Sequence, residues 1–257
     1  MRGIRAPRAW WDGGVTLSEL WLVRHGESAA NVAAARAEAD GADRIDIAWR
    51  DADVPLTDTG REQSRALARL LAGRCAPNAV WSSPYLRARQ TIELALPDAE
   101  PGRIRLDERL RDRELGILDL LTSHGVEHLL PAERARRSRL GKLYYRPPGG
   151  ESWADVAARL RSFLRDADDL RDADDGGGVA LLAVHDAVIW LVVYVCLSLD
   201  EAALFDLIDG NVLANASFTR LVRQGGGWRL EALGETAHLV EQDAPVTEHE
   251  GERSDVR

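Results

Sequence analysis

The sequence predicts an α/β fold with a mostly parallel central sheet and helices on both of its faces. Three short apolar runs support this prediction, because none alternates with polar residues and each leads into a polar turn and then a helix-like stretch: ELWLV (19–23), NAVWS (78–82) and GVALLAV (178–184). Strands that are apolar on both sides are typical of a parallel sheet covered on both faces. With 257 residues, 45% of them hydrophobic, the chain is long enough to bury such a core in one domain.

Helix signals follow the first two runs. The alanine-rich stretch 29–39 favours a helix after the first. A crossover helix is predicted next, with Thr57 or Thr59 as its N-cap, and Glu62 would complete a capping box with Thr59. After the second run, Pro84 suits the first turn of another helix. Each strand therefore has a helix to cover it.

The segment 117–150 interrupts this alternation and predicts a helical lid inserted over the sheet. It is long and charged, with helix-like patterning over 131–145 and a Pro- and Gly-rich loop over 146–150. A well-patterned helix over 151–170 then leads back to the third strand.

The C-terminal third predicts a β-hairpin at the sheet edge. The stretches SFTRLVR (217–223) and WRLEAL (228–233) flank QGGG, which is turn-forming chemistry between two strands. We expect one catalytic domain over 19–239, preceded by a disordered extension over 1–18 and followed by a disordered acidic tail over 240–257.

Charge and composition exclude several classes of function. A net charge of −9 and a pI near 5.2 disfavour broad binding to nucleic acid or to an anionic membrane. The longest apolar stretch, 187–199, is shorter than the roughly 20 residues that span a bilayer, and it predicts a buried helix. Two cysteines, Cys75 and Cys196, imply no disulfide framework. We therefore expect a cytoplasmic protein.

Chemically active side chains follow all three predicted strands. Arg24 and His25 follow the first, Ser82 and Ser83 with Arg87 follow the second, and His185 and Asp186 follow the third. Ligands of open parallel sheets bind beyond the carboxyl ends of the strands. Arginine forks and helix N-termini together predict a pocket for a phosphate-like anion. A neutral imidazole is the best nucleophile toward phosphorus among these groups.

The same motifs resemble those of the histidine phosphatase superfamily, in its phosphoglycerate-mutase-like branch. The resemblance covers roughly residues 19–239 and rests on six motifs in order: LVRHGESAAN, PLTDTGREQS, WSSPYLRARQT, LRDRELG, PGGES and AVHDAVI. The R-H-G-E tetrapeptide alone is a weak signal, and the later arginine and histidine motifs make it specific.

The resemblance implies a role for each site residue. His25 would be the nucleophile that becomes phosphohistidine, and His185 would stabilise the transferring phosphoryl group with Arg24 and Arg87. Asn31 would also contact phosphate. This chemistry implies no cofactor and no metal.

Phosphoryl transfer from an alcohol also needs a proton donor. In the mutase-like branch this is a carboxylate four residues before a glycine, which is Asp112 before Gly116 in this chain. The family usually has glutamate there, so Glu114 and Asp186 stay as alternatives. Asp186 follows the late histidine directly, as does the acid of the acid-phosphatase branch.

Three further features have weaker functional signals. His124 and His128 have the spacing of two metal ligands on a helix, but no third ligand is evident. The run ERARRSR (133–139) could bind a second phosphate or carboxylate of the substrate, or form a solvated helix face. The tryptophans, among them Trp49 and Trp153, are assigned to packing or to pocket walls.

We therefore predict a phosphatase that hydrolyses a small phosphorylated metabolite, a phosphomonoester, through phosphohistidine. The alternatives are a phosphoglycerate-type mutase and an inactive member that only binds a phosphorylated ligand. The expected partner is the small-molecule substrate, with neither nucleic acid nor membrane. Oligomeric state is left open, with a homodimer as one alternative.

Overall fold

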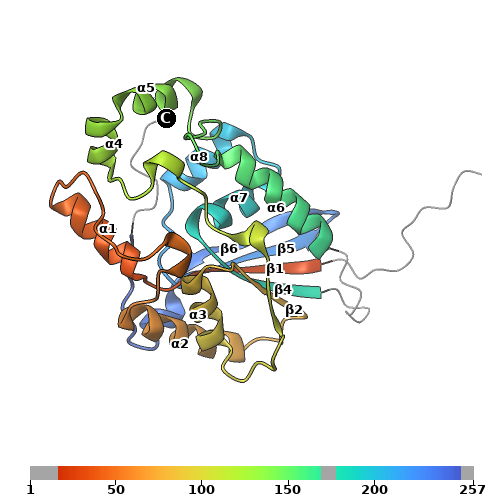
Figure 1. Ribbon diagram of the computed structural model, residues 1–257. Coiled ribbons are helices and arrows are strands. Elements are labelled where there is room, and N and C mark those ends of the chain that lie inside the picture. The colour runs from red at the N-terminus through yellow and green to blue at the C-terminus, as the bar shows by residue number, and fades with distance from the viewer. Residues whose placement is uncertain (1–16, 169–177, 250–257) are drawn as a thin grey trace, which may run out of the picture.

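The computed structural model describes residues 17–168 and 178–249, which form a six-stranded sheet in the order β3-β2-β4-β1-β5-β6 (Figure 1). The strands are β1 (Leu17–Arg24), β2 (Ala79–Ser82), β3 (Ile104–Leu106), β4 (Gly178–Val184), β5 (Phe218–Gln224) and β6 (Gly227–Glu235). The pairs among β1 to β4 are parallel, and β5 is antiparallel to both β1 and β6. The predicted fold class and the edge hairpin are confirmed. The short edge strand β3 was not predicted, because three residues carry too little periodicity to be recognised.

Helices cover both faces of the sheet (Figure 1). One face is covered by α2 (Asp58–Ala72) and α3 (Leu86–Ala95), the other by α6 (Trp153–Ala167), α7 (Asp186–Leu197) and α8 (Glu201–Asp209). The remaining helical elements are α1 (Ala29–Ala39), α4 (Ser123–Leu129), α5 (Pro131–Leu140), α9 (Ala237–Val240) and the 3₁₀ turns η1 (Asp51–Asp53), η2 (Glu108–Leu110) and η3 (Gly116–Leu118). None of the helices in the described residues is long and apolar enough to cross a membrane.

Strand β1 shows how one apolar run supplies both cores. Successive side chains of a strand point to opposite faces. Leu20 and Leu22 pack into the core under α6 and α7, whereas Trp21 and Val23 pack into the core under α2 and α3. Every one of these four side chains is at most 2% exposed, so a polar residue at any of them would leave an unsatisfied group in a core.

Two helix starts differ from the prediction. Thr57, not Thr59, caps α2, because its side chain accepts from the backbone N–H of Gly60, so the capping box predicted with Glu62 does not form. Helix α3 begins at Leu86, after Pro84 rather than at it.

The predicted lid is helical, and it is divided into η3, α4 and α5. The helix predicted over 131–145 ends at Leu140, because Gly141 has a φ of 78°. A left-handed backbone at this position ends a helix and favours glycine.

The termini of the domain also differ from the prediction. Strand β1 begins at Leu17, two residues before the predicted start of the domain, while residues 1–16 and 250–257 lie outside the described part. Residues 240–249, which the prediction placed in a disordered tail, instead contact the rest of the domain. Gln63 Nε2 donates to the carbonyl oxygen of Pro245 at 2.9 Å, and the backbone N–H of Asn215 donates to the carbonyl oxygen of Thr247 at 3.0 Å. The low apolar content of this segment suggested disorder, but its backbone is held by hydrogen bonds to polar groups elsewhere in the domain, which composition does not reveal.

The sheet order places the predicted site residues together. Strand β4 lies between β1 and β2, with Arg24 paired to Val184 and Ser82 paired to Ala183. The three carboxyl ends are therefore level, and His25, Ser83 and His185 follow them side by side.

Candidate active site

His25 directly follows β1, and its imidazole is buried with one ring nitrogen hydrogen-bonded. It is 4% exposed, and its Nδ1 lies 2.8 Å from the carbonyl oxygen of Gly26. A carbonyl can only accept, so Nδ1 carries the proton and Nε2 keeps its lone pair. The ring centroid of His185 is 5.2 Å away. The sequence prediction that these two histidines meet is confirmed by this distance.

The loop after His25 is fixed by residues of the matching motifs. The N–H of Gly26 donates to Thr91 Oγ1 at 2.9 Å, and the N–H of Glu27 donates to Gln63 Oε1 at 2.8 Å. A Cβ on Gly60 would lie 2.0 Å from the carbonyl oxygen of Glu27, so the start of α2 can approach this closely only with glycine. Sequence reasoning found these motifs but assigned no role to Thr91 or Gln63.

Arg87 is held between two carboxylates. Its Nη1 donates to the backbone oxygen of Asp51 at 2.7 Å and to the Oδ1 of the same residue at 2.8 Å, while Nη2 donates to Asp112 Oδ2 at 3.0 Å. The guanidinium is oriented in this way before any ligand arrives. Asp51 was missed in the sequence, because it lies in a segment without periodicity or motif.

His185 is oriented by Ser83 and Asp112. Nε2 lies 2.8 Å from Ser83 Oγ, which also accepts from the backbone N–H of Tyr85 at 3.2 Å. The serine hydroxyl can therefore donate to Nε2, which assigns the imidazole proton to Nδ1. Nδ1 lies 3.2 Å from Asp112 Oδ2, close enough for an ion pair but not aligned as a hydrogen bond.

The two remaining predicted phosphate ligands line the same pocket, and both already contact the protein. Arg24 donates to the carbonyl oxygen of Leu213 and, at 3.2 Å, to that of His249. Asn31 Oδ1 accepts from Ser28 at the N-terminus of α1, which leaves its NH₂ group as the donor for a ligand.

Burial sets the protonation states of the histidines. Burial, and after it the charge of Arg87, lowers the pKa of His25 well below its usual value. Burial also lowers the pKa of His185, although Asp112 opposes this. For Asp112 burial raises the pKa, but His185 and Arg87 outweigh it and hold the pKa well below its usual range. The imidazole of His25 is thus neutral and Asp112 is ionised.

The lowered pKa of His25 predicts a loss of stability in acid. Above the unfolded-state pKa of about 6.5, His25 is neutral in both the folded and the unfolded chain, so the free energy of unfolding does not depend on its protonation. Below that pH the unfolded chain protonates His25 and the folded chain does not, so the free energy of unfolding falls. His25→Gln should therefore lose less stability than the unmodified protein between pH 7.5 and 5.5, by up to about 1.4 kcal/mol. Urea unfolding at both pH values measures this difference. His128→Gln, whose imidazole is 64% exposed, is the control, and equal losses in all three proteins would contradict a neutral His25.

The three candidate proton donors lie in different environments. Asp112 lines the pocket and contacts both His185 and Arg87. Glu114 is absent from the pocket lining and accepts from the hydroxyl of Tyr85 at 3.2 Å. Asp186 lines the pocket, and its Oδ1 accepts from Trp190 Nε1 at 3.1 Å. Geometry favours Asp112.

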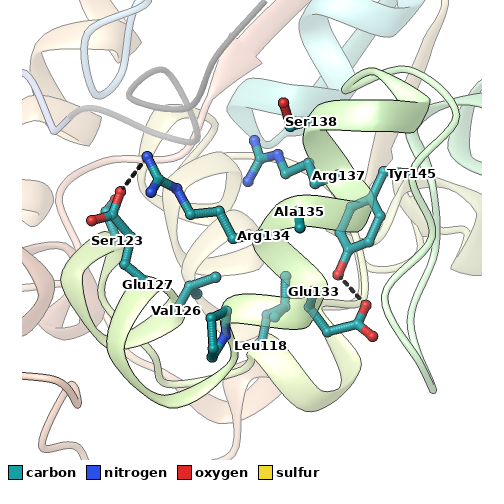
Figure 2. Close-up of a pocket in the computed structure, with 11 residues that line it drawn as sticks. Leu118, Ser123, Val126, Glu127, Glu133, Arg134, Ala135, Arg137, Ser138 and Tyr145 are labelled. Atoms are coloured by element: carbon teal, nitrogen blue, oxygen red, sulfur yellow. Dashed lines mark hydrogen bonds and ion pairs between the residues drawn. The ribbon is translucent and has the colours of Figure 1, made fainter.

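A second cavity lies within the lid, apart from the pocket around His25. The catalytic pocket has a volume of about 240 Å³, and Trp49 and Trp153 are both in its wall. The second cavity, about 390 Å³, is lined by Arg134 and Arg137, which extend side by side from α5 (Figure 2). Arg134 pairs with Glu127 at 2.8 Å. None of the residues of ERARRSR lines the pocket around His25.

His124 and His128 share one carboxylate. Their Nδ1 atoms lie 3.0 Å and 2.9 Å from the two oxygens of Asp43, which ties α4 to the loop after α1. Within the described ranges no cluster of three or more His, Cys, Asp or Glu side chains could hold a metal. The pair is thus accounted for as a structural contact.

Comparison with known proteins identifies the family. The sequence profile of the histidine phosphatase superfamily (branch 1) matches residues 20–236. The chain belongs to this superfamily. The predicted membership, and with it the prediction of an enzyme of the histidine phosphatase type, is confirmed.

Several known proteins resemble this histidine phosphatase over most of its length. A probable phosphoglycerate mutase, GpmB, of Yersinia enterocolitica is 28% identical over 228 residues, 86% of this chain and 94% of the relative. A mycobacterial glucosyl-3-phosphoglycerate phosphatase, solved with VO3, has a TM-score of 0.68 and 27% identity over 85% of this chain and 100% of its own. An α-ribazole-5'-P phosphatase from Escherichia coli, described as putative, has a TM-score of 0.66 and 21% identity over 85% of this chain and 97% of its own. That last likeness supports the fold alone.

Proposed function

We propose that this chain is a phosphatase that hydrolyses a small phosphomonoester through a phosphohistidine on His25. The observation that carries the proposal is the tautomer of His25. The Nδ1–H of His25 donates to the carbonyl of Gly26, so Nε2 keeps its lone pair. His25 lies in a pocket that is also lined by Arg24 and Arg87. The likeness in fold and sequence to a mycobacterial glucosyl-3-phosphoglycerate phosphatase also supports a phosphatase.

The reaction has two transfers of one phosphoryl group. Nε2 of His25 attacks phosphorus, the bond from phosphorus to the alcohol oxygen breaks, and Asp112 gives that oxygen a proton. Water then attacks phosphorus and gives a proton to Asp112, while the phosphorus–nitrogen bond breaks. Inorganic phosphate leaves, and both side chains return to their starting states.

Four side chains stabilise the charge on the phosphoryl oxygens in both steps. They are Arg24, Asn31, Arg87 and His185, and we assign them to phosphate binding and charge stabilisation as the sequence motifs imply. Because Arg87 and the helix N-termini are oriented beforehand, they need little rearrangement as charge moves.

The substrate itself prepares Asp112 as the acid. His185 and Arg87 hold the pKa of Asp112 well below its usual range, so the carboxyl is ionised before substrate binds. A phosphoryl dianion competes for the guanidinium of Arg87 and for the imidazole of His185, and it places negative charge beside the carboxylate. Both effects raise the pKa of Asp112, so it gains a proton only when substrate is bound.

A phosphoglycerate-type mutase is the second candidate, and the likeness to GpmB favours it. In a mutase the phosphohistidine returns its phosphoryl group to substrate. This substrate carries a carboxylate in addition to phosphate. Two of the lid arginines that could have bound it, Arg134 and Arg137, line the other cavity (Figure 2). This placement favours hydrolysis.

Phosphorus NMR distinguishes the candidates. The protein would be incubated with 3-phosphoglycerate and a trace of 2,3-bisphosphoglycerate, and separately with a panel of phosphomonoesters. Growth of inorganic phosphate from a panel member is the expected result. Growth of a 2-phosphoglycerate signal would support the mutase, and no change with any ester would support an inactive phosphate-binding protein.

A further inference from the structure

The catalytic pocket has an apolar wall beyond its phosphate-binding floor. Six side chains from two segments form this apolar wall: Ile45, Ile47, Trp49, Leu115, Leu120 and Leu121. Trp49 is 49% exposed and Leu120 is 37% exposed. Single exposed apolar residues are ordinary, but a group of them that faces an active site marks a binding surface.

The two segments of the apolar wall are joined by backbone contacts. The N–H of Ile45 donates to the carbonyl of Leu120 at 2.9 Å, and Arg44 bridges to Leu121. Next to them, the N–H of Thr122 donates to the carbonyl of Asp43 at 3.2 Å. The loop after α1 and the start of the lid thus form one piece (Figure 1).

Leu120 is held in a backbone conformation that leucine seldom adopts. Its φ is 57°, in the left-handed region, where a Cβ is disfavoured. Two hydrogen bonds keep Leu120 in this conformation. Its carbonyl accepts from the N–H of Ile45, and its own N–H donates to Asp119 Oδ1 at 3.0 Å. This strain presents an apolar side chain to the pocket, and strain of this kind is concentrated at functional sites.

Charge around the pocket disfavours an anionic alcohol group. The lining contains three arginines and four aspartates. Arg24 and Arg87 belong to the phosphate-binding floor, and Arg113 is only 5% exposed, with Nε donating to the carbonyl of Glu151 at 2.9 Å. Asp119 lies beside the apolar wall, and burial, then the charge of Asp51, raises its pKa. A second anionic group of a substrate would therefore meet carboxylates and leucines.

We propose that the alcohol part of the substrate is uncharged and apolar, an aromatic or alicyclic alcohol that packs on Trp49 and Leu120 while its phosphate lies on His25. This inference rests on the proposed phosphatase function. A pocket of about 240 Å³ accommodates one phosphate and one ring rather than a dinucleotide or a larger conjugate.

Two matched esters test the substrate class. Benzyl phosphate and 4-carboxybenzyl phosphate share the same reacting CH₂–O–P group and differ by one remote carboxylate. We expect kcat/KM to be at least about tenfold higher for benzyl phosphate. Equal values, or a preference for 4-carboxybenzyl phosphate, would overturn the inference and leave the phosphatase proposal intact, whereas hydrolysis of neither ester, nor of any ester in the NMR panel, would overturn both.

Variants of the apolar wall test which residues carry the preference. Trp49→Ala and Leu120→Asn should lower kcat/KM for benzyl phosphate about tenfold more than for 2-hydroxyethyl phosphate. Asparagine tolerates the left-handed backbone, so Leu120→Asn removes the apolar side chain without changing the loop. Tyr144→Ala is the control, because Tyr144 is an aromatic residue, 60% exposed, outside the pocket lining. Equal losses on both esters would overturn the assignment of the apolar wall.

Discussion

Replacement of His25 by alanine is expected to lower kcat by at least about 10³-fold while the fold is retained. The neighbouring imidazole of His185 cannot take over, because its Nε2 is hydrogen-bonded to Ser83 and its Nδ1 faces Asp112. Steady-state hydrolysis of 4-nitrophenyl phosphate measures the loss, and circular dichroism with urea unfolding reports whether the fold is retained. His124→Ala, an exposed histidine on the lid, is the matched control.

A direct readout of the intermediate separates catalysis from stability. Rapid acid-free denaturation after mixing with a ³²P-labelled ester should trap alkali-stable, acid-labile phosphate on the unmodified protein and none on His25→Ala. If alanine destabilises this buried position, His25→Gln fills it with a side chain of similar length and gives the same test. A variant that turns over at the full rate, or a label that persists without His25, would refute the phosphohistidine mechanism.

The location of the site was predictable because it depends on strand ends. Apolar runs mark β1, β2 and β4 in the sequence, and the rule that ligands bind at the carboxyl ends of parallel strands selects the residues that follow them. His25, His185 and Arg87 were found in this way, and each of them lines or borders the pocket. These assignments needed no knowledge of the sheet order, only that the three strands are parallel.

The parts of the site that were missed depend on contacts distant in sequence. Asp51 meets Arg87 across 36 residues, and His249 meets Arg24 across 225. Both lie in segments without helical or strand periodicity, so neither carries a local signal. The apolar wall was missed for the same reason, since Leu120 reaches the pocket only because its backbone is left-handed and bonded to Ile45.

The cap of α2 shows where local rules leave two alternatives open. Thr57 and Thr59 were both candidate caps, and Glu62, three residues after Thr59, could have formed a capping box with it. In the structure Thr57 Oγ1 also donates to Glu27 Oε1 at 2.7 Å, a contact that fixes Thr57 at the start of the helix. A tertiary hydrogen bond to the loop after His25 thus decides between two residues of equal capping propensity.

The largest effect that depends on the leaving group is expected for Asp112→Asn. Asparagine keeps an oxygen for Arg87 and His185 but has no proton to give to an alkoxide. Benzyl phosphate, with a poor leaving group, should lose about 10²–10³-fold in kcat/KM, whereas 4-nitrophenyl phosphate, whose phenolate leaves without a proton, should lose less than about tenfold. Steady-state kinetics on both esters measures the difference.

Glu114→Gln and Asp186→Asn are the matched controls, because each removes one carboxylate near the same pocket. Each control variant should lose kcat/KM to the same extent on the two esters, because Glu114 is hydrogen-bonded to Tyr85 and Asp186 to Trp190. Equal losses on both esters in Asp112→Asn would mean that Asp112 only orients Arg87 and His185. A leaving-group dependence in one of the controls would instead assign the proton to that residue. In our mechanism the phosphoryl dianion raises the Asp112 pKa, so the donor must contact the same side chains as the substrate. Among the three carboxylates only Asp112 contacts both Arg87 and His185 in the described structure.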